Sequence, residues 1–531
     1  MTLSDVEIIT TSPDIVKVRS TKRIKKKRLL VYVTRTSLPS YLLIESLNEI
    51  GYSVELLESS LLLASKRETK CDLFWCGCDT DDVIPTKRQN RIPAMKFACR
   101  KGPMCQLVNL MQDLFPEEFT FLPRSWPLPS NYSAFCHYVF SGMKSNRNKS
   151  SDKVYILKPD EGAQGDGIYL FKSPADITQG TLTKNCVVQE YVNNPLLLDG
   201  YKFDLRLYVL ISKLNPIEAY ICKEGLGRFC TEKYEKPATK NLGKAYMHLT
   251  NYSLNKFSKD FVQTDDDCNG SKRTLTAVMN QMLILGHDTD KLWALIENIV
   301  MKTLLCIVPL IKVEQLNMDP SINESIDYFH LLGFDILIDD QLKPFLLEVN
   351  GFPSMRTDYE AYNEFFEKQT FPSPVDEKVK KIVLKGAMHI LFKKTCNEDY
   401  SCLLDAQNAE ENKMFYIFEE CRKLFMVFLK KSPNRKTSLL GTTGFRSFVR
   451  NCKILEIVPD VTNADLDLLF INIGQSSELS SSKHLSFMSF YKLLTQLSAK
   501  RSPDDDTYIA LNSLIKECYL SNVLTHARTI C

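Results

Sequence analysis

Two apolar segments joined by a short polar turn constrain the fold of this chain more than any other feature. Residues 331–338 and 342–350 are strongly apolar, and the turn between them is Asp-Asp-Gln. This pattern predicts a β-hairpin in a half-buried sheet. The first segment carries Asp335, and the second ends in Glu348 and Asn350.

The polar side chains of this hairpin predict a cation site. Side chains two positions apart on a strand face the same side, so Glu348 and Asn350 point together, and the hairpin brings Asp335 opposite Glu348. Two buried carboxylates without a cation repel each other, which favours protonation of one acid. Oxygen ligands of this kind suit Mg²⁺, which also takes water and substrate phosphates. For Asp335 alone, a structural acid that accepts backbone hydrogen bonds is the alternative.

A strand predicted at residues 201–210 alternates polar and apolar side chains. Lys202, Asp204 and Arg206 share one face, and the apolar residues between them share the other. Two cations around one acid suit phosphates and a ribose. An ordinary solvated strand face is the alternative.

A glycine-rich loop at residues 161–167 follows an apolar strand that delivers Lys158. Glycines let backbone N–H groups approach a polyphosphate closely, and the hairpin can fold over it as a flap. The loop matches neither the Walker motif nor the dinucleotide fingerprint, and an ordinary hairpin turn is the alternative. Residues 187–192 form a short apolar strand with a polar end that can read an adenine edge.

The order of the predicted elements indicates an α/β fold followed by helices. Residues 29–57 read as a small β-α-β unit, and strands alternate with helices from residue 154 to about residue 392. The later helices loosely resemble a degenerate pair of EF-hands, without the carboxylates that calcium needs, so no calcium is expected. These helices are predicted at residues 412–430, 445–452, 465–473 and 485–497.

Composition narrows the function classes. The formal charge of +3 argues against a general nucleic-acid coat protein, so no nucleic-acid partner is expected. The 17 scattered cysteines and the absence of a secretory signal predict a reducing, cytoplasmic setting. The longest apolar stretches, such as residues 303–311, are too short to span a bilayer, so no membrane span is expected. The basic residues between Lys17 and Arg28 are interpreted either as an arm for an acidic partner or as a solvated leader.

Taken in order, these elements resemble the ATP-grasp superfamily and, more closely, the tubulin tyrosine ligase-like family. The most specific signature is Met-His-Leu-Thr-Asn-Tyr-Ser at residues 247–253, and Gly225 to Phe229 and Leu347 to Asn350 also match. The resemblance implies an ATP-grasp ligase core with a small N-terminal α/β domain and an all-helical C-terminal extension. The expected parts are a basic disordered arm at 1–28, the N-terminal α/β domain at 29–100, a central ATP-grasp domain with the flap at 101–195, a C-terminal ATP-grasp domain with the Mg/ATP site at 196–395, and the helical extension at 396–531.

The resemblance also implies roles for individual residues. Asp335, Glu348 and Asn350 match the magnesium ligands. For the ligase chemistry that the resemblance implies, Arg206 and Arg228 are the catalytic candidates to stabilise the phosphate and the oxyanion. The positions that match nucleotide contacts are Lys158, Gln164, Gly165, Gln189, Glu190, Tyr191, Val192, Lys202, Phe203, Asp204, Thr250 and Asn251. The positions that match contacts to the incoming amino acid are Arg228, Tyr252, Ser253, Lys272 and Lys380.

The implied function is that of a tubulin polyglutamylase, an ATP-dependent ligase that joins free L-glutamate to tubulin through an acyl phosphate. ATP and Mg²⁺ are the expected cofactors, and the acidic C-terminal tails of tubulin in microtubules are the expected acceptor. The protein is expected to be a monomer at the cytoskeleton, with the cilium or basal body as candidate locations. A cation-rich set of amino-acid contacts favours a dicarboxylate. A glycine or tyrosine ligase on the same fold and an inactive microtubule-binding protein are the alternatives.

Two positions depart from the family pattern. Asp166 stands in the glycine-rich loop where members often carry a basic residue, and Gly351 stands where many members begin a Ser-Pro-Ser run. The second departure leaves open whether the enzyme starts a branch or lengthens a chain. The choice between α- and β-tubulin also stays open.

Overall fold

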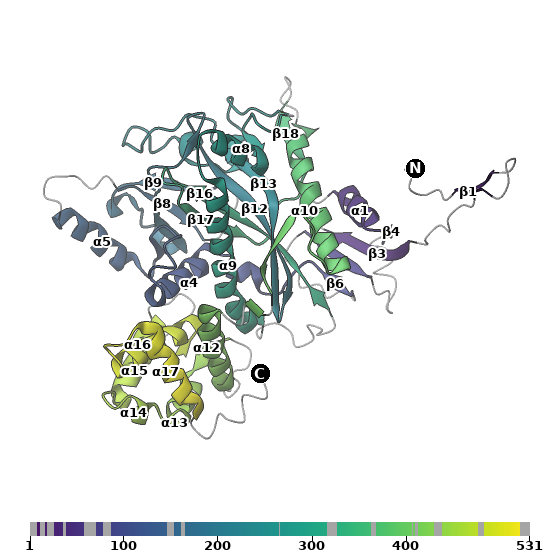
Figure 1. The fold of residues 1–531 in the computed structure, drawn as a ribbon. Coiled ribbons are helices and arrows are strands. Elements are labelled where there is room, and N and C mark those ends of the chain that lie inside the picture. The colour runs from purple at the N-terminus through teal and green to yellow at the C-terminus, as the bar shows by residue number, and fades with distance from the viewer. Residues whose placement is uncertain are drawn as a thin grey trace.

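The computed structural model has a mixed α/β fold with a helical C-terminal region, which confirms the predicted fold class (Figure 1). The limits of the domains stay a prediction. The structure describes residues 8–10, 16–18, 26–34, 39–57, 71–77, 86–145, 153–160, 165–264, 266–315, 326–362, 368–405, 407–408, 412–429, 438–475 and 483–520.

A small parallel sheet carries the predicted β-α-β unit. Its strand order is β15-β6-β5-β3-β4, and the helix α1 (Ser40–Glu49) buries its leucines against the helix α10 (Pro374–Lys393). Upstream, β1 (Ile8–Thr10) and β2 (Val16–Val18) pair antiparallel, so the prediction of a disordered arm is wrong for these two segments. Their β-branched residues favour strands. The strands of the small sheet are β3 (Lys27–Thr34), β4 (Tyr52–Leu56), β5 (Leu73–Cys76), β6 (Arg88–Gln89) and β15 (Asp327–Tyr328).

A four-stranded antiparallel sheet carries the glycine-rich loop. Its order is β7-β10-β8-β9, and the helix α5 (Tyr132–Ser145) packs Phe135 against Trp126 on one face. Gly165 has a φ of +84°, a conformation that a side chain would strain. The strands are β7 (Ser125–Leu128), β8 (Tyr155–Pro159), β9 (Tyr169–Phe171) and β10 (Cys186–Glu190).

The largest sheet has the order β14-β13-β12-β16-β17, with antiparallel neighbours. The long helix α9 (Thr289–Glu314) covers one face, and α10 covers the other (Figure 1). The predicted hairpin is β16–β17, and its register places Asp335 opposite Glu348, as expected. The strands are β12 (Tyr201–Leu214), β13 (Ile217–Phe229), β14 (Lys272–Thr274), β16 (His330–Ile338) and β17 (Pro344–Asn350), and β11 (Leu197–Leu198) pairs with β12.

The helix α9 extends well beyond the apolar stretch at residues 303–311. It has 26 residues and, by length and composition alone, is long and apolar enough to cross a membrane. Its most apolar window is nevertheless 72% buried inside the protein. Its partners include the helices α4 (Lys101–Leu114) and α12 (Lys413–Leu429). The estimate that the apolar stretches are too short was wrong because charged residues such as Lys302 interrupt the run, while the helix continues through them.

The C-terminal region contains the predicted helices and also elements that the sequence pattern missed. The strand β20 (Tyr400–Leu404) pairs with β13, so the region is not entirely helical. β21 (Leu440–Gly441) pairs with β22 (His484–Leu485) and links two helix–strand–helix halves, as in a pair of EF-hands. The helices after α12 are α13 (Thr442–Asn451), α14 (Ile454–Ile457), α15 (Asn463–Gln475), α16 (Phe487–Arg501) and α17 (Thr507–Leu520).

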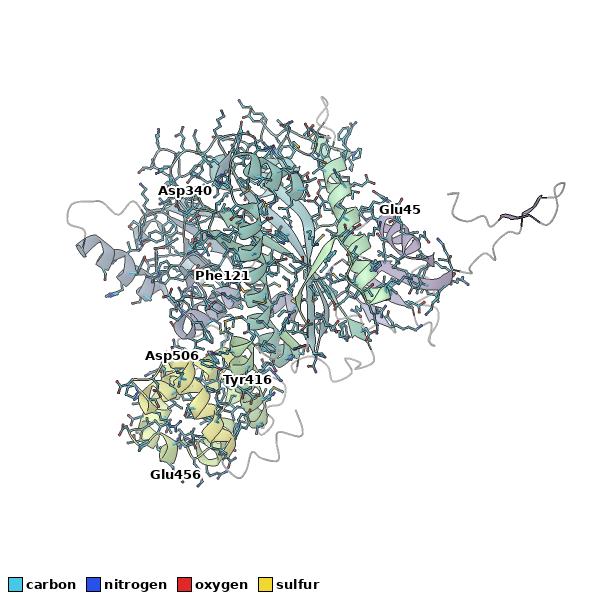
Figure 2. All side chains as sticks on the ribbon, in the orientation of Figure 1. Glu45, Phe121, Asp340, Tyr416, Glu456 and Asp506 are labelled. Carbon is cyan, nitrogen blue, oxygen red and sulfur yellow. The ribbon has the colours of Figure 1, made fainter. Side chains whose placement is uncertain are left out.

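The C-terminal helices share a hydrophobic core with α4 and α9. Tyr508 of α17 contacts Phe115 at the end of α4, with ring centroids 5.8 Å apart, and Tyr491 of α16 is fully buried. Tyr416 and Asp506 lie near this junction, and Glu456 lies at the far end of the module (Figure 2).

A buried histidine connects the residues after β6 to the end of the β16–β17 hairpin. His330 is fully buried, and its Nδ1 accepts a hydrogen bond from the Ile92 N–H at 3.1 Å. Its Nε2–H therefore donates to the Gly351 carbonyl at 2.6 Å. Burial and, to a smaller extent, the nearby charge of Arg91 together lower the pKa of His330 to about 3. Protonation would place a proton on Nδ1 against the Ile92 N–H.

The folded protein is therefore expected to lose stability as the pH falls. The pKa of His330 is about 3 in the folded protein and about 6.5 in the unfolded chain. Its contribution to the free energy of unfolding is therefore complete above pH 6.5 and declines as the pH falls toward 3. Between pH 7 and pH 5 the loss is about 2 kcal/mol. Urea unfolding of the wild type and of His330→Gln measures it. The stability difference between the two proteins should shrink by about this amount, and a constant difference would contradict the assignment.

Candidate active site

An open cavity of ≈ 610 Å³ lies between the four-stranded sheet and the large sheet. Its apolar side includes Ile156, Ile168, Leu337 and Leu347, which suit a purine ring. The sequence reading did not single out these four residues. The predicted nucleotide residues that line this cavity are Lys158, Gln189, Glu190, Tyr191, Val192, Lys202, Asp204, Thr250 and Asn251.

Two buried lysines give the cavity its positive charge. Lys158 Nζ lies 2.8 Å from Gln189 Oε1, and burial lowers the pKa of Lys158 to about 8. Lys202 Nζ donates to the Tyr191 hydroxyl at 2.9 Å and to the His248 carbonyl at 2.7 Å, and burial lowers its pKa to about 8 as well. An anionic ligand would offset the cost of burying these charges.

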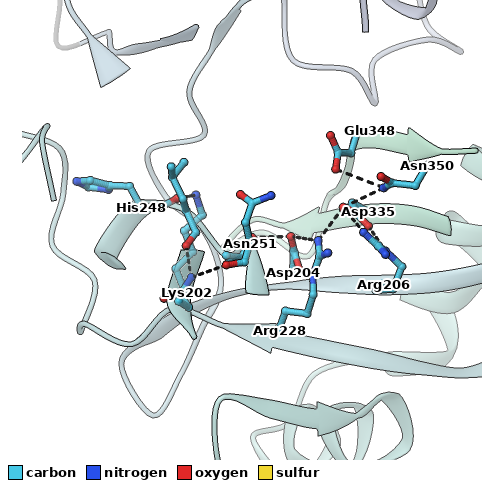
Figure 3. A network of polar contacts seen from close by, with 12 residues as sticks. Lys202, Asp204, Arg206, Arg228, His248, Asn251, Asp335, Glu348 and Asn350 are labelled. Carbon is cyan, nitrogen blue, oxygen red and sulfur yellow. Dashed lines mark hydrogen bonds and ion pairs between the residues drawn. The ribbon is translucent and has the colours of Figure 1, made fainter. Parts of the chain in front are cut away.

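Two arginines and two aspartates form a buried network beside the lysines (Figure 3). Arg228 donates to both carboxylate oxygens of Asp204 at 2.7 Å and to Asp335 Oδ2 at 2.7 Å. Arg206 pairs with Asp335 at 2.5 Å, and the Thr250 hydroxyl donates to Asp204 at 2.6 Å. Burial opposes the charge of Asp335, yet the two arginines hold its pKa well below its ordinary value.

The arginines correct one step of the sequence argument. The two hairpin acids were expected to need a cation to stay charged, but Arg206 and Arg228 already supply a counter-charge to Asp335. Glu348 is less buried, and its carboxylate lies 3.5 Å from Lys101 Nζ.

The hairpin residues fit a divalent cation. Asn350 Nδ2 lies 3.4 Å from Asp335 Oδ2 and 3.3 Å from Glu348 Oε1, so three side chains meet at one point (Figure 3). The nitrogen and oxygen of an asparagine amide are exchanged by a flip, which would present a third oxygen. Two carboxylates and an amide suit Mg²⁺ together with phosphate oxygens.

A second cavity, of ≈ 600 Å³, adjoins the first through Arg228, which lines both. Tyr252, Lys272 and Lys380 also line it, so the structure brings together most of the residues predicted to hold the amino acid. Ser253 lies on the short helix α7 (Tyr252–Asn255) but lines neither cavity.

Other predicted residues lie outside the cavities. The Phe203 side chain points into the core and stacks on Phe229, because alternation along β12 turns it away from Lys202 and Asp204. The prediction that the Phe203 side chain contacts the nucleotide is therefore wrong. Gly165 sits beside Asn251 at the edge of the first cavity, and Gln164 lies outside the described residues.

The sequence reading missed several charged residues of the second cavity. Lys256, Arg356 and Asp376 line it. Asp376 lies in the first turn of α10, where a negative charge stabilises the helix dipole, so the sequence alone indicates no further role for it. Only the fold places it against Lys272 of β14, while Lys380 lies four residues along the same helix.

Two family models match this chain. A model of the tubulin-tyrosine ligase family matches residues 82–370, and a model of the EF-hand region of tubulin polyglutamylase TTLL11 matches residues 403–528. Human tubulin polyglutamylase TTLL11 is 38% identical over 77% of this chain. This chain spans 62% of that relative, which is less than two thirds of its length.

Two further relatives match over most of their length. Mouse tubulin polyglutamylase TTLL11 is 34% identical, over 88% of this chain and 74% of the relative. Tubulin polyglutamylase ttll-11 of Caenorhabditis elegans is 32% identical, over 85% of this chain and 68% of the relative. This chain belongs to the tubulin-tyrosine ligase family.

Proposed function

We propose that this protein is an ATP-dependent ligase that adds glutamate to the acidic C-terminal tails of tubulin. The observation that carries the proposal is the pairing of two cavities through Arg228, one with buried lysines and apolar walls and the other rich in cations. Relatives named tubulin polyglutamylases support the choice of substrate. The protein would act at the microtubule cytoskeleton, and the cilium and the basal body are candidate locations.

The first cavity would hold ATP. Ile156, Ile168 and Leu337 would enclose the base, and Lys158 and Lys202 would bind the phosphates. Asp335, Glu348 and Asn350 would hold magnesium, which would offset negative charge on the transferring phosphate.

The reaction follows from the chemistry of an amide bond. The terminal phosphoryl group of ATP moves to the acceptor carboxylate, which gives ADP and an acyl phosphate. The amine of free glutamate then attacks the acyl carbon, the bond from that carbon to the phosphate oxygen breaks, and inorganic phosphate and a proton leave. Arg206 and Arg228 lie where they would stabilise the transferring phosphoryl group and the oxyanion.

The second cavity favours glutamate as the incoming amino acid. Lys272 and Lys380 are buried and line the cavity together with Arg228, so it presents ammonium and guanidinium groups to a dicarboxylate. Glycine has no side-chain carboxylate to meet them, and tyrosine would need an apolar slot.

The products of the reaction test this mechanism. One ADP and one inorganic phosphate are expected for each glutamate added, and ¹⁸O in the acceptor carboxylate is expected to appear in the phosphate. Mass spectrometry of the phosphate, with an unlabelled acceptor as control, makes the measurement. Formation of AMP and pyrophosphate, or phosphate without ¹⁸O, would contradict an acyl phosphate.

A further inference from the structure

A buried carboxylate, that of Asp376, lines the second cavity. Asp376 is the third residue of α10, and 2% of its surface is exposed. Its Oδ2 lies 2.6 Å from Lys272 Nζ and accepts a hydrogen bond from the Ser373 hydroxyl at 2.7 Å. Its Oδ1 lies 2.7 Å from Lys380 Nζ.

Two segments of the chain meet at this carboxylate. Lys272 comes from β14, 104 residues away along the chain, and Lys380 comes from the next turn of α10. The Lys272 ammonium lies 3.6 Å from the centre of the Tyr252 ring. Lys380 also donates to the Arg356 carbonyl. Each ammonium is therefore held by a second partner besides Asp376.

The cluster of Lys272, Lys380 and Asp376 carries one net positive charge. Two buried lysines face a single aspartate, while Arg228 is already paired with Asp204 and Asp335. Two buried ammonium groups without a carboxylate would repel each other and lose protons. A cluster with one net positive charge matches one incoming carboxylate.

We propose that Asp376 is a positioning residue of the amino-acid site, which fixes the spacing of Lys272 and Lys380 so that they bind one carboxylate of free glutamate. This inference rests on the proposed function, because it takes glutamate as the occupant of the second cavity. Asp376 itself would repel that carboxylate, so it acts through the two lysines and is not a catalytic residue.

The electrostatics agree with this geometry. Burial raises the pKa of a carboxyl group, but Lys380 and Lys272 hold the pKa of Asp376 well below its ordinary value. Burial lowers the pKa of Lys272, and Asp376 opposes that shift. The groups that face Lys272 are Asp376, Lys380, Arg228 and the Tyr252 ring. Asp376 is the one acid among these groups, and Asp358 and Glu360 line the same cavity.

The Asp376→Asn variant of the full chain tests the inference, because it keeps the shape and removes the charge. Its KM for glutamate at pH 8.5 is expected to rise at least tenfold, which is about 1.4 kcal/mol, while its KM for ATP changes less than about twofold. The glutamate KM of the variant is also expected to rise from pH 6.5 to pH 9, since removal of the Asp376 charge would lower the pKa of Lys272 further. The wild type should vary little over this range.

Glu377→Gln provides the matched control. It removes the same charge from the neighbouring residue, whose carboxylate binds the Tyr41 hydroxyl and lines neither cavity. Its two KM values should equal those of the wild type. If Asp376→Asn does not fold, the double variant Asp376→Asn with Lys380→Met keeps the net charge of the cluster. That variant should show the raised glutamate KM without the pH dependence.

Three outcomes would overturn the inference. An unchanged glutamate KM with a flat pH profile would mean that Asp376 does not act on the site. An equal rise in both KM values would indicate a general structural role. Direct binding of labelled glutamate to the wild type separates these results from failure of the proposed function, because a wild type that binds no glutamate would remove the occupant itself.

Discussion

The Glu348→Gln variant is expected to fold like the wild type, and its ligation rate is expected to fall at least about 100-fold. The residue lies at the meeting point of the hairpin side chains, with Asn350 at 3.3 Å, and the loss of one carboxylate would weaken the cation site. Stability should change little because the Glu348 side chain is 23% exposed and its one described ion pair, to Lys101, is 3.5 Å long.

The rate of labelled glutamate transfer and the thermal unfolding midpoint measure the two parts of this prediction. Asp340→Asn is the matched control, because it removes an exposed carboxylate from the turn of the same hairpin (Figure 2). Its rate should equal that of the wild type. Full activity of Glu348→Gln would exclude the residue as a metal ligand.

Arg228→Leu is expected to destabilise the protein by about 3–5 kcal/mol. The variant leaves the buried Asp204 and Asp335 with one arginine between them, and Asp204 loses both of its 2.7 Å bonds to the guanidinium. The cost comes from uncompensated buried charge rather than from the lost attraction itself. Urea unfolding at neutral pH measures the change.

The control for Arg228→Leu is the same substitution at Arg446. That arginine pairs with Asp467 on the surface of the C-terminal module, and its side chain is 54% exposed. An exposed pair contributes at most about 1 kcal/mol, so Arg446→Leu should have a small effect. Equal effects of the two substitutions would contradict the buried network.

The hairpin and the alternating strand were predictable because local pattern determines both. Apolar residues on both sides of a polar turn set the register that places Asp335 opposite Glu348. Alternation along β12 puts Lys202 and Asp204 on one face. The same rule sends Phe203 to the opposite face, which the residue-by-residue resemblance overlooked.

Other features depended on contacts between distant segments. Asp376 meets Lys272 across 104 residues, and no local pattern indicates that pairing. The strand β20 forms because β13 offers it a free edge, and the two-residue strands of the EF-hand-like module are too short for any periodicity. The helix α9 continues beyond its apolar run because it packs against other elements along its length.

Amino-acid incorporation into microtubules tests the proposal that this protein uses ATP to join glutamate to tubulin tails. Labelled glutamate, glycine and tyrosine are each incubated with microtubules, Mg-ATP and the full chain, with microtubules that lack the acidic tails as control. Glutamate alone should be incorporated, and only into microtubules that carry the tails. Incorporation of glycine or tyrosine instead, or of none of the three, would contradict the proposal.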